Sequence, residues 1–247
     1  MHWVVQDNIY SQRNLDLIVD ALERAGIEHT VVTIPRGSKS IDPDVDPEGK
    51  VFVCGALKMA VVAQAKGWAP GSLLNDNFHF EIWQRHLGDE LLNSSARVAT
   101  LRDLDLETDE FVRPVEDNKA FTGRVFRAAS FQEWKDENPA LAELQVMASA
   151  MQKIYREYRL FFVNQTFVTG SLYLQAGEPA FSPDVDPEAV DYARTMVSAW
   201  HPAQAFVIDV ALTEHGYKII EFNNINSSGF YDSDVNRLVA SLQTAFD

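Results

Sequence analysis

The chain is poor in the residues that mark several protein classes. Its 247 residues include a single cysteine, Cys54, which excludes an intrachain disulfide and a thiolate metal cluster. Its 12 glycines and 10 prolines are too few for a fibrous or low-complexity protein. No stretch approaches the roughly 18 consecutive apolar residues of a membrane span. Residues 1–8 lack a positive region ahead of a long apolar run, so we expect a first strand there and not a signal peptide. These absences favour a cytoplasmic globular protein.

Basic residues are also scarce, with 21 Lys and Arg against 36 Asp and Glu and a net charge of −15. This balance argues against a duplex DNA binder, which needs a basic surface to displace counterions. An anionic ligand still fits, because a local basic cluster or a bound divalent cation reverses the field at one site. The six histidines lack zinc-site spacing. We expect no nucleic-acid or membrane partner, and no pattern indicates an oligomeric state.

The first part of the chain has the element order of a small α/β layer with a mostly parallel sheet. The expected elements are a strand at 3–6, a helix at 11–25, strands at 27–34 and 51–55, and a helix at 56–66. Residues 67–95 are irregular and rich in aromatic side chains. The simplest interpretation is that these aromatics form core, and the alternative is that they line an acceptor pocket.

A polar, acidic stretch begins near Ala96, and we place a domain boundary there, between 1–95 and 96–247. We expect the second domain to contain both strands and helices. Its expected strands are at 110–113, 123–128, 142–148, 156–164, 166–174, 204–212 and 217–223, and its expected helices are at 131–137, 187–199 and 232–246.

The strongest candidate site lies on two strands, 205–213 and 217–223. If a three-residue turn joins them, Asp209 lies opposite Glu221, and alternation puts Asn223 on the same face as Glu221. Two carboxylates facing each other among Val, Ile and Phe repel, and a divalent cation removes that repulsion. Carboxylate and amide oxygens suit Mg²⁺. The alternative is that the two acids lie on a solvated sheet face or pair with Lys or Arg.

A second cluster is basic. Arg113 ends a strand, Lys119 follows it, and Arg159 begins a strongly apolar strand. The arginine fork matches phosphate or carboxylate in a bidentate manner, and lysine acts as a point charge on phosphate. The alternative for each side chain alone is that it snorkels or forms a salt bridge.

Together the clusters form an ordered set that resembles the ATP-grasp superfamily. The nearest pattern is the clade named for two conserved arginines and a lysine, which includes uncharacterised bacterial and phage families. The set comprises Arg113-Pro114, Lys119, Glu157-x-Arg159, Asp209 and Glu221-x-Asn223. The resemblance covers 96–247 and implies an ATP-grasp fold of two α+β lobes, with a hinge near 144–148. Residues 1–95 resemble the small α/β domain that precedes this module.

The resemblance also implies cofactors and roles. ATP and Mg²⁺ bind between the lobes, with Asp209, Glu221 and Asn223 as the metal ligands. Lys119 and Arg159 contact phosphates, and Arg113 contacts a phosphate or the substrate carboxylate. Adenine lies against the segment that contains Gln145, Val146 and Met147. The catalytic assignments are Arg113 and Arg159.

One feature departs from the family pattern. Many members cover the phosphates with a loop of several glycines, whereas only Gly123 lies near Lys119 here. The closure is then weaker, or Phe121 and Thr122 supply the lid.

Other candidates have ordinary interpretations. Residues 36–40 lack the spacing of a phosphate-binding loop and read as a flexible loop. Cys54 ends an apolar strand and reads as a buried thiol. Residues 227–229 read as a turn that touches substrate or phosphate. Pro-Asp-Val-Asp-Pro-Glu occurs twice, at 43–48 and 183–188, as acidic turns, the second with Asp186 capping a helix.

The leading hypothesis is an ATP-dependent carboxylate–amine or carboxylate–thiol ligase that acts through an acylphosphate. Its partners are a small-molecule or peptide substrate with a carboxylate and an amine acceptor. One alternative is a nucleotide-binding or interaction module that keeps the fold without turnover. Another is a Mg²⁺-dependent phosphohydrolase, which uses the same ligands with water as the acceptor.

Overall fold

The computed structural model describes residues 1–8, 11–115 and 120–247. Within these, the chain forms two compact units. The first combines 1–78 with 154–247, and the second comprises 79–153. Each unit has its own sheets and core. This packing division does not test the expected boundary between 1–95 and 96–247, which stays a prediction. No helix in the described ranges is long and apolar enough to cross a bilayer.

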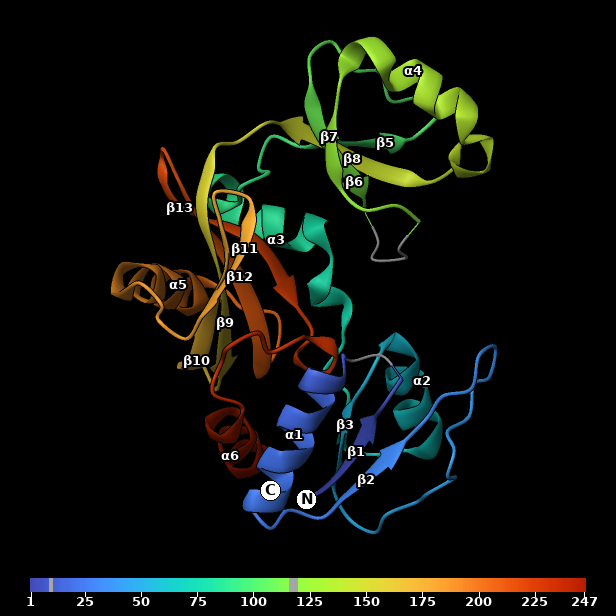
Figure 1. The fold of residues 1–247 in the computed structure, drawn as a ribbon, viewed down its shortest axis with the longest axis vertical. Helices are drawn as coiled ribbons and strands as arrows, with labels where there is room; N and C mark the ends of the chain where they lie inside the picture. The colour runs from blue at the N-terminus through green and yellow to red at the C-terminus, as the bar shows by residue number, and fades with distance from the viewer. Residues whose placement is uncertain (9–10, 116–119) are drawn as a thin grey trace. The chain divides into compact units, whose positions relative to one another are not determined.

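The N-terminal part of the first unit is a four-stranded sheet in the order β2-β1-β3-β4. Figure 1 labels the first three of these strands. Its strands are β1 (His2–Gln6), β2 (His29–Val32), β3 (Val51–Cys54) and β4 (Pro70–Gly71). Its helices are α1 (Gln12–Arg24) and α2 (Leu57–Lys66), with η1 (Asp76–Phe78) after the sheet. All three strand pairings are parallel, which confirms the expected parallel layer. The Ser11 hydroxyl accepts a hydrogen bond from the backbone N–H of Asn14 and caps the start of α1.

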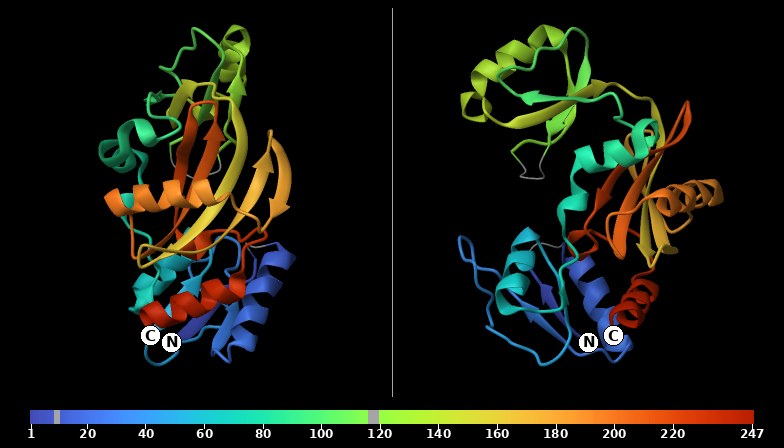
Figure 2. Two further views of the ribbon diagram at one scale, coloured as in Figure 1. Left: turned by 90° about the vertical axis from the view of Figure 1, so that its left-hand side faces the viewer. Right: turned by 180° about the vertical axis from the view of Figure 1, so that it is seen from behind.

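The rest of the first unit is a five-stranded antiparallel sheet in the order β11-β10-β9-β12-β13. Its strands are β9 (Ile154–Val163), β10 (Thr166–Gln175), β11 (Glu178–Ser182), β12 (Ala205–Thr213) and β13 (Gly216–Asn223). Its helices are α5 (Pro187–Ala199), η4 (Ile225–Ser227) and α6 (Val235–Phe246). Helix α5 runs along one face of this sheet, and α1 lies beside α6 (Figures 1 and 2).

A shared core joins the two sheets of the first unit. Side chains of α1 and α6 pack with Trp3 and Phe52 of the parallel sheet and with Phe161 and Val207 of the antiparallel sheet. Val207 and Phe161 are register partners, and both are fully buried. Because Asp209 lies two residues beyond Val207 on the same strand face, the core anchors the rung on which the candidate site lies.

The second unit holds a four-stranded antiparallel sheet in the order β5-β8-β6-β7. Its strands are β5 (Arg97–Thr100), β6 (Glu110–Pro114), β7 (Arg124–Phe126) and β8 (Gln145–Ala150). Its helices are α3 (Phe80–Leu87), η2 (Gly88–Glu90), α4 (Ala128–Glu137) and η3 (Pro139–Leu141). An aromatic cluster of Phe121, Phe126, Phe131 and Trp134 fills the space between the sheet and α4.

Three local expectations need correction. Residues 67–95 are not wholly irregular, because α3 forms there with Phe80 and Trp83 buried on one side. Strands β5 and β11 were not expected, since neither segment has a strong apolar pattern. Asp186 does occupy the N-cap position of α5, yet its side chain makes no capping bond. It accepts instead from Tyr158 and Arg156 of β9.

Candidate functional site

Three neighbouring strands bring the candidate residues into one rung of the five-stranded sheet. On β12, Asp209 pairs with Glu221 of β13 on one side and with Arg159 of β9 on the other. Residues in register on adjacent strands project from the same face of a sheet. Asp209, Glu221 and Arg159 therefore share a face, and Asn223 joins them because it lies two residues beyond Glu221.

The expected pairing of Asp209 with Glu221 is correct, but the expected turn is wrong. Thr213 pairs with Gly216, so the turn has two residues and not three. Continued without interruption, that register would place Asp209 opposite Ile220. The ladder instead shifts between Asp209 and Val210, which leaves Ile220 as an extra residue in β13. This β-bulge returns Glu221 to the face of Asp209.

Asp209 has a cationic partner inside the protein. Arg159 donates from Nε to Asp209 Oδ1 at 2.9 Å and from Nη2 to Oδ2 at 2.6 Å. Asp209 is 1% exposed, and the Arg159 side chain is 12% exposed. The third guanidinium nitrogen, Nη1, donates to the carbonyl oxygen of Gly229 at 3.4 Å. For Asp209, the alternative of pairing with an arginine is thus what the structure shows.

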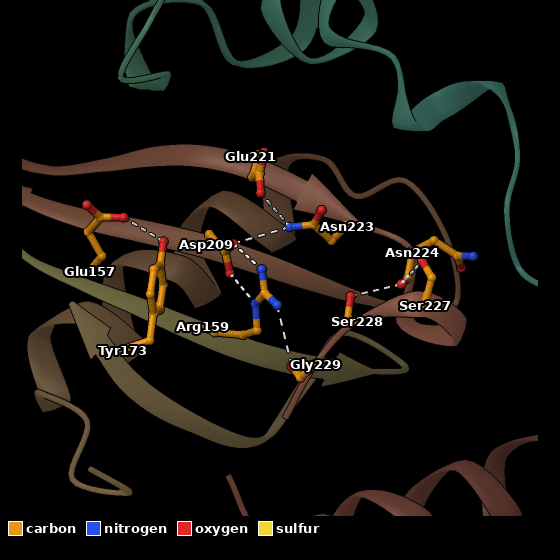
Figure 3. A network of polar contacts seen from close by, with 10 residues as sticks. All are labelled: Glu157, Arg159, Tyr173, Asp209, Glu221, Asn223, Asn224, Ser227, Ser228 and Gly229. Atoms are coloured by element: carbon orange, nitrogen blue, oxygen red, sulfur yellow. Dashed lines mark hydrogen bonds and ion pairs between the residues drawn. The ribbon is translucent and has the colours of Figure 1, made fainter. Parts of the chain in front are cut away.

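Asn223 connects the two carboxylates (Figure 3). Its amide nitrogen donates to Asp209 Oδ2 at 3.2 Å and to Glu221 Oε1 at 3.0 Å. The amide nitrogen, and not the oxygen, faces Asp209 (Figure 3). The acidic pair is therefore held together by donors from the chain itself.

Burial and charge act in opposite directions on this network. Burial raises the pKa of the Asp209 carboxyl to about 6, against the opposing charge and hydrogen bonds of Arg159. The charges of Glu221 and Glu157 add to the rise. Burial also disfavours the charge on Arg159, but Asp209 outweighs it, so the pKa of the guanidinium is raised. At neutral pH the bidentate pair is ionised.

Three further side chains, none with a role expected from the sequence, lie on the same face. Tyr173 donates to Glu157 Oε2 at 2.6 Å, and burial raises the pKa of Glu157. Tyr231 has a φ of 51° and stacks on Tyr173 with ring centroids 4.9 Å apart. Both rings lie within 6 Å of the Arg159 guanidinium carbon. A left-handed φ at an aromatic residue is a sign of a functional site. Glu157 was present in the ordered motif, whereas no sequence spacing pointed to Tyr231.

The donor set fits a divalent cation of the magnesium type. Among the described residues, no three His, Cys, Asp or Glu side chains are grouped closely enough to hold a metal. The expected set instead combines the two carboxylates of Asp209 and Glu221 with the amide of Asn223, whose nitrogen contacts both. Turning that amide by about 180° would place a third oxygen beside the carboxylates, which gives the all-oxygen set that hard cations prefer.

The remaining nucleotide-site predictions fall in the second unit or outside the described residues. Arg113 lies on β6 and donates from Nε to the Met147 sulfur at 3.0 Å. Val146 and Met147 are buried on β8, and Gln145 is exposed at its start. Strand β8 pairs with β5 on one side and with β6 on the other, so residues 145–147 lie within a central strand of the sheet. Lys119 lies outside the described residues.

The minor candidates mostly follow their ordinary interpretations. Cys54 is buried, and burial raises the pKa of its thiol to about 12. The hydroxyls of Ser227 and Ser228 donate to the Asn224 carbonyl in a turn directly after β13 (Figure 3). Phe121, offered as part of a lid, packs on Trp134 within the aromatic cluster of the second unit.

The fold matches known structures across nearly the whole chain. D-cycloserine synthetase DcsG is 12% identical, with 98% of both chains covered and a TM-score of 0.67. A RimK domain ATP-grasp protein from Sphaerobacter thermophilus is 14% identical, with 99% of this chain and 95% of that chain covered and a TM-score of 0.63. D-alanine–D-alanine ligase from Bacillus anthracis, solved with ATP, is 11% identical, with 99% and 98% covered and a TM-score of 0.62.

At these identities the likeness shows the fold alone, which is the ATP-grasp fold, as expected. No curated protein matches the chain by sequence. A family model does match, over residues 47–242, and it describes an ATP-grasp domain of family 3 in the clade named for two arginines and a lysine. This match includes the whole of the rung formed by Arg159, Asp209 and Glu221. The chain belongs to this ATP-grasp family.

Proposed function

We propose that the protein is an ATP-dependent ligase that activates a carboxylate as an acylphosphate and transfers the acyl group to an amine or a thiol. The observation that carries this proposal is the set of Asp209, Glu221 and Asn223 on one sheet face of an ATP-grasp chain. Two carboxylates that both contact one amide supply the kinds of oxygen ligand that Mg²⁺ prefers.

Each residue of the network has a defined task in this proposal. Asp209, Glu221 and Asn223 hold the cation, which supplies charge neutralisation for the phosphate groups of ATP when it is bound. Arg159 keeps Asp209 ionised and in place through Nε and Nη2, and its Nη1, which donates to the Gly229 carbonyl at 3.4 Å, is the nitrogen assigned to phosphate.

The second part of the proposal concerns residues 79–153. The guanidinium fork of Arg113 binds a phosphate or the substrate carboxylate, and the ammonium group of Lys119 binds a phosphate as a point charge. The segment 145–147 contacts the adenine. Phosphoryl transfer of this kind needs orientation and electrostatic stabilisation more than a general base.

The charge and the structural relatives support a proposal for the chemistry of the substrate. One matching structure is an ATP-grasp ligase PsnB complexed with a minimal precursor, and another is a D-alanine–D-alanine ligase. We extend from these to an amino-acid or peptide carboxylate as the donor. A cationic amine is the favoured acceptor, because a net charge of −15 steers cations toward the protein.

The test is an ADP-release screen of amino acids, peptides and amines with ATP and Mg²⁺. A ligase releases ADP only when donor and acceptor are both present, and the joined product appears in equal amount by mass spectrometry. ADP release without any acceptor identifies a phosphohydrolase. ATP binding without ADP release under any combination identifies a non-catalytic nucleotide-binding module. Asp209→Asn serves as the matched inactive control.

A further inference from the structure

The Asn223 amide nitrogen lies where two carboxylates converge. It donates one proton to Asp209 Oδ2 and the other to Glu221 Oε1, at 3.2 and 3.0 Å. An NH₂ group that bridges two acids carries partial positive charge into the space between them. A cation shared by the same two carboxylates would have to enter that space, so the amide and the cation compete for one position.

The two hydrogen-bond partners of Asp209, Arg159 and Asn223, differ in how costly they are to remove. A carboxylate has about four lone-pair sites. Oδ1 accepts from Arg159 Nε, while Oδ2 accepts from both Arg159 Nη2 and Asn223 Nδ2. Removing Arg159 would leave a buried charge uncompensated, which is costly. Turning the Asn223 amide breaks two ordinary hydrogen bonds and leaves the ion pair intact. Asn223 is therefore the movable partner and Arg159 the fixed one.

Electrostatics sets the direction in which the amide faces. With its oxygen toward Asp209 and Glu221, the amide would place a partial negative charge against two acids, which is unfavourable unless a cation lies among them. With its nitrogen toward them, both acids gain a donor. The orientation in Figure 3, with the nitrogen toward both acids, is the one that the two carboxylates favour by themselves.

We propose that Asn223 acts as a placeholder: its amide nitrogen bridges Asp209 and Glu221 in the metal-free protein, and the amide turns to present its oxygen when a divalent cation binds. This inference rests on the proposed function, because it takes the same three residues as the cation site. It adds that Asn223, itself one of the proposed ligands, keeps the Asp209 and Glu221 carboxylates in position before a cation binds.

Two substitutions at this position and one control test the placeholder. Asn223→Asp supplies oxygen only, Asn223→Ala supplies neither donor nor acceptor, and Asn236→Asp makes the same charge change at an exposed position on α6. Thermal unfolding is measured in EDTA and in Mg²⁺. Mn²⁺ binding is measured by calorimetry in the presence of a non-hydrolysable ATP analogue.

The placeholder predicts a pattern of signs. Both Asn223 variants melt about 2–6 °C lower in EDTA, because the bridging donors are lost. Mn²⁺ then binds roughly tenfold more tightly to Asn223→Asp and roughly tenfold more weakly to Asn223→Ala. Mg²⁺ accordingly raises the melting temperature of Asn223→Asp more than that of the unmodified protein. Asn236→Asp changes none of these values beyond about 2 °C.

Two outcomes overturn the inference while leaving the proposed function standing. Unchanged melting in EDTA for both Asn223 variants shows that the amide does not bridge the acids. Equal Mn²⁺ affinity in Asn223→Asp and Asn223→Ala shows that its oxygen does not face the cation. Absence of Mn²⁺ binding to the unmodified protein is a different result, which overturns the cation site and the proposed function together.

Discussion

Replacing Glu221 by glutamine separates a cation-binding role from a structural one. Without a cation, oxygens of Asp209 and Glu221 lie 3.2 and 3.0 Å from one Asn223 nitrogen, and so at most 6.2 Å apart. Two like charges at that distance repel by roughly 1–3 kcal/mol for effective dielectric constants of about 80 to 20. Glutamine removes this repulsion, keeps the volume, and weakens the hydrogen bond from Asn223 by about 1 kcal/mol.

We therefore expect Glu221→Gln to be about 0–2 kcal/mol more stable than the unmodified protein in EDTA. ADP release with Mg²⁺ should meanwhile fall by orders of magnitude, because the phosphoryl group loses charge stabilisation. The assays are urea unfolding in EDTA and acceptor-dependent ADP release. Glu178→Gln, an exposed glutamate on β11, is the matched control and should change neither value.

The opposite pair of results refutes this reasoning. If Glu221 serves only as a salt-bridge partner of a nearby Lys or Arg, Glu221→Gln loses stability in EDTA and keeps normal turnover. Loss of stability with preserved turnover would remove Glu221 from the cation site.

Four further predictions test separate parts of the molecule. Arg159→Met should destabilise the protein by about 3–5 kcal/mol in urea, because its buried carboxylate partner is left uncompensated, whereas a side chain serving phosphate alone would leave stability unchanged. Lys119→Ala should weaken ATP binding in calorimetry by about 1–3 kcal/mol, and unchanged affinity would make it an ordinary surface charge. Cys54 should resist thiol reagents until the protein unfolds, since burial raises its pKa to about 12, and fast labelling of the native protein would contradict its burial. The hydrogen bond from Tyr158 lowers the pKa of Asp186 in the folded protein. The ionised carboxyl therefore stabilises the fold at a pH above the unfolded-state pKa, and this stabilisation is lost as the pH falls below about 4. Asp186→Asn should make the stability measured by urea unfolding less dependent on pH in that acid range.

Local patterns were sufficient for much of the architecture. The Asp186-Pro187 start predicted a helix at 187–199, and α5 has those limits. Alternation within one strand placed Glu221 and Asn223 on the same face, and the ladder agrees. These features depend on neighbouring residues, whose geometry is fixed by the backbone period.

The features that could not be predicted depend on strands far apart in the chain. Arg159 and Asp209 are 50 residues apart, and their pairing follows from the register of β9 against β12. Tertiary packing sets that register. The turn is one residue shorter than expected, and the bulge at Ile220 adds one residue to β13. The two differences cancel, so the predicted pairing of Asp209 with Glu221 is correct although the predicted turn is wrong. A single-residue slip would have sent Glu221 to the opposite face.

The Arg159–Asp209 pair also changes how the acidic residues bear on catalysis. If Asp209 and Glu221 only repelled each other, binding a cation would be the reason for their presence. Their presence would then argue against a non-catalytic module. In this protein Arg159 pairs with Asp209, and Asn223 donates to both acids, so part of the repulsion between the acids is offset without a cation. The acids therefore support a cation site, and turnover is the property that separates a ligase from a binding module. The discriminating quantity is the response to a cation: a ligase site must bind Mg²⁺ and couple that binding to ADP release, whereas a module held together by its internal pairs gains nothing from Mg²⁺.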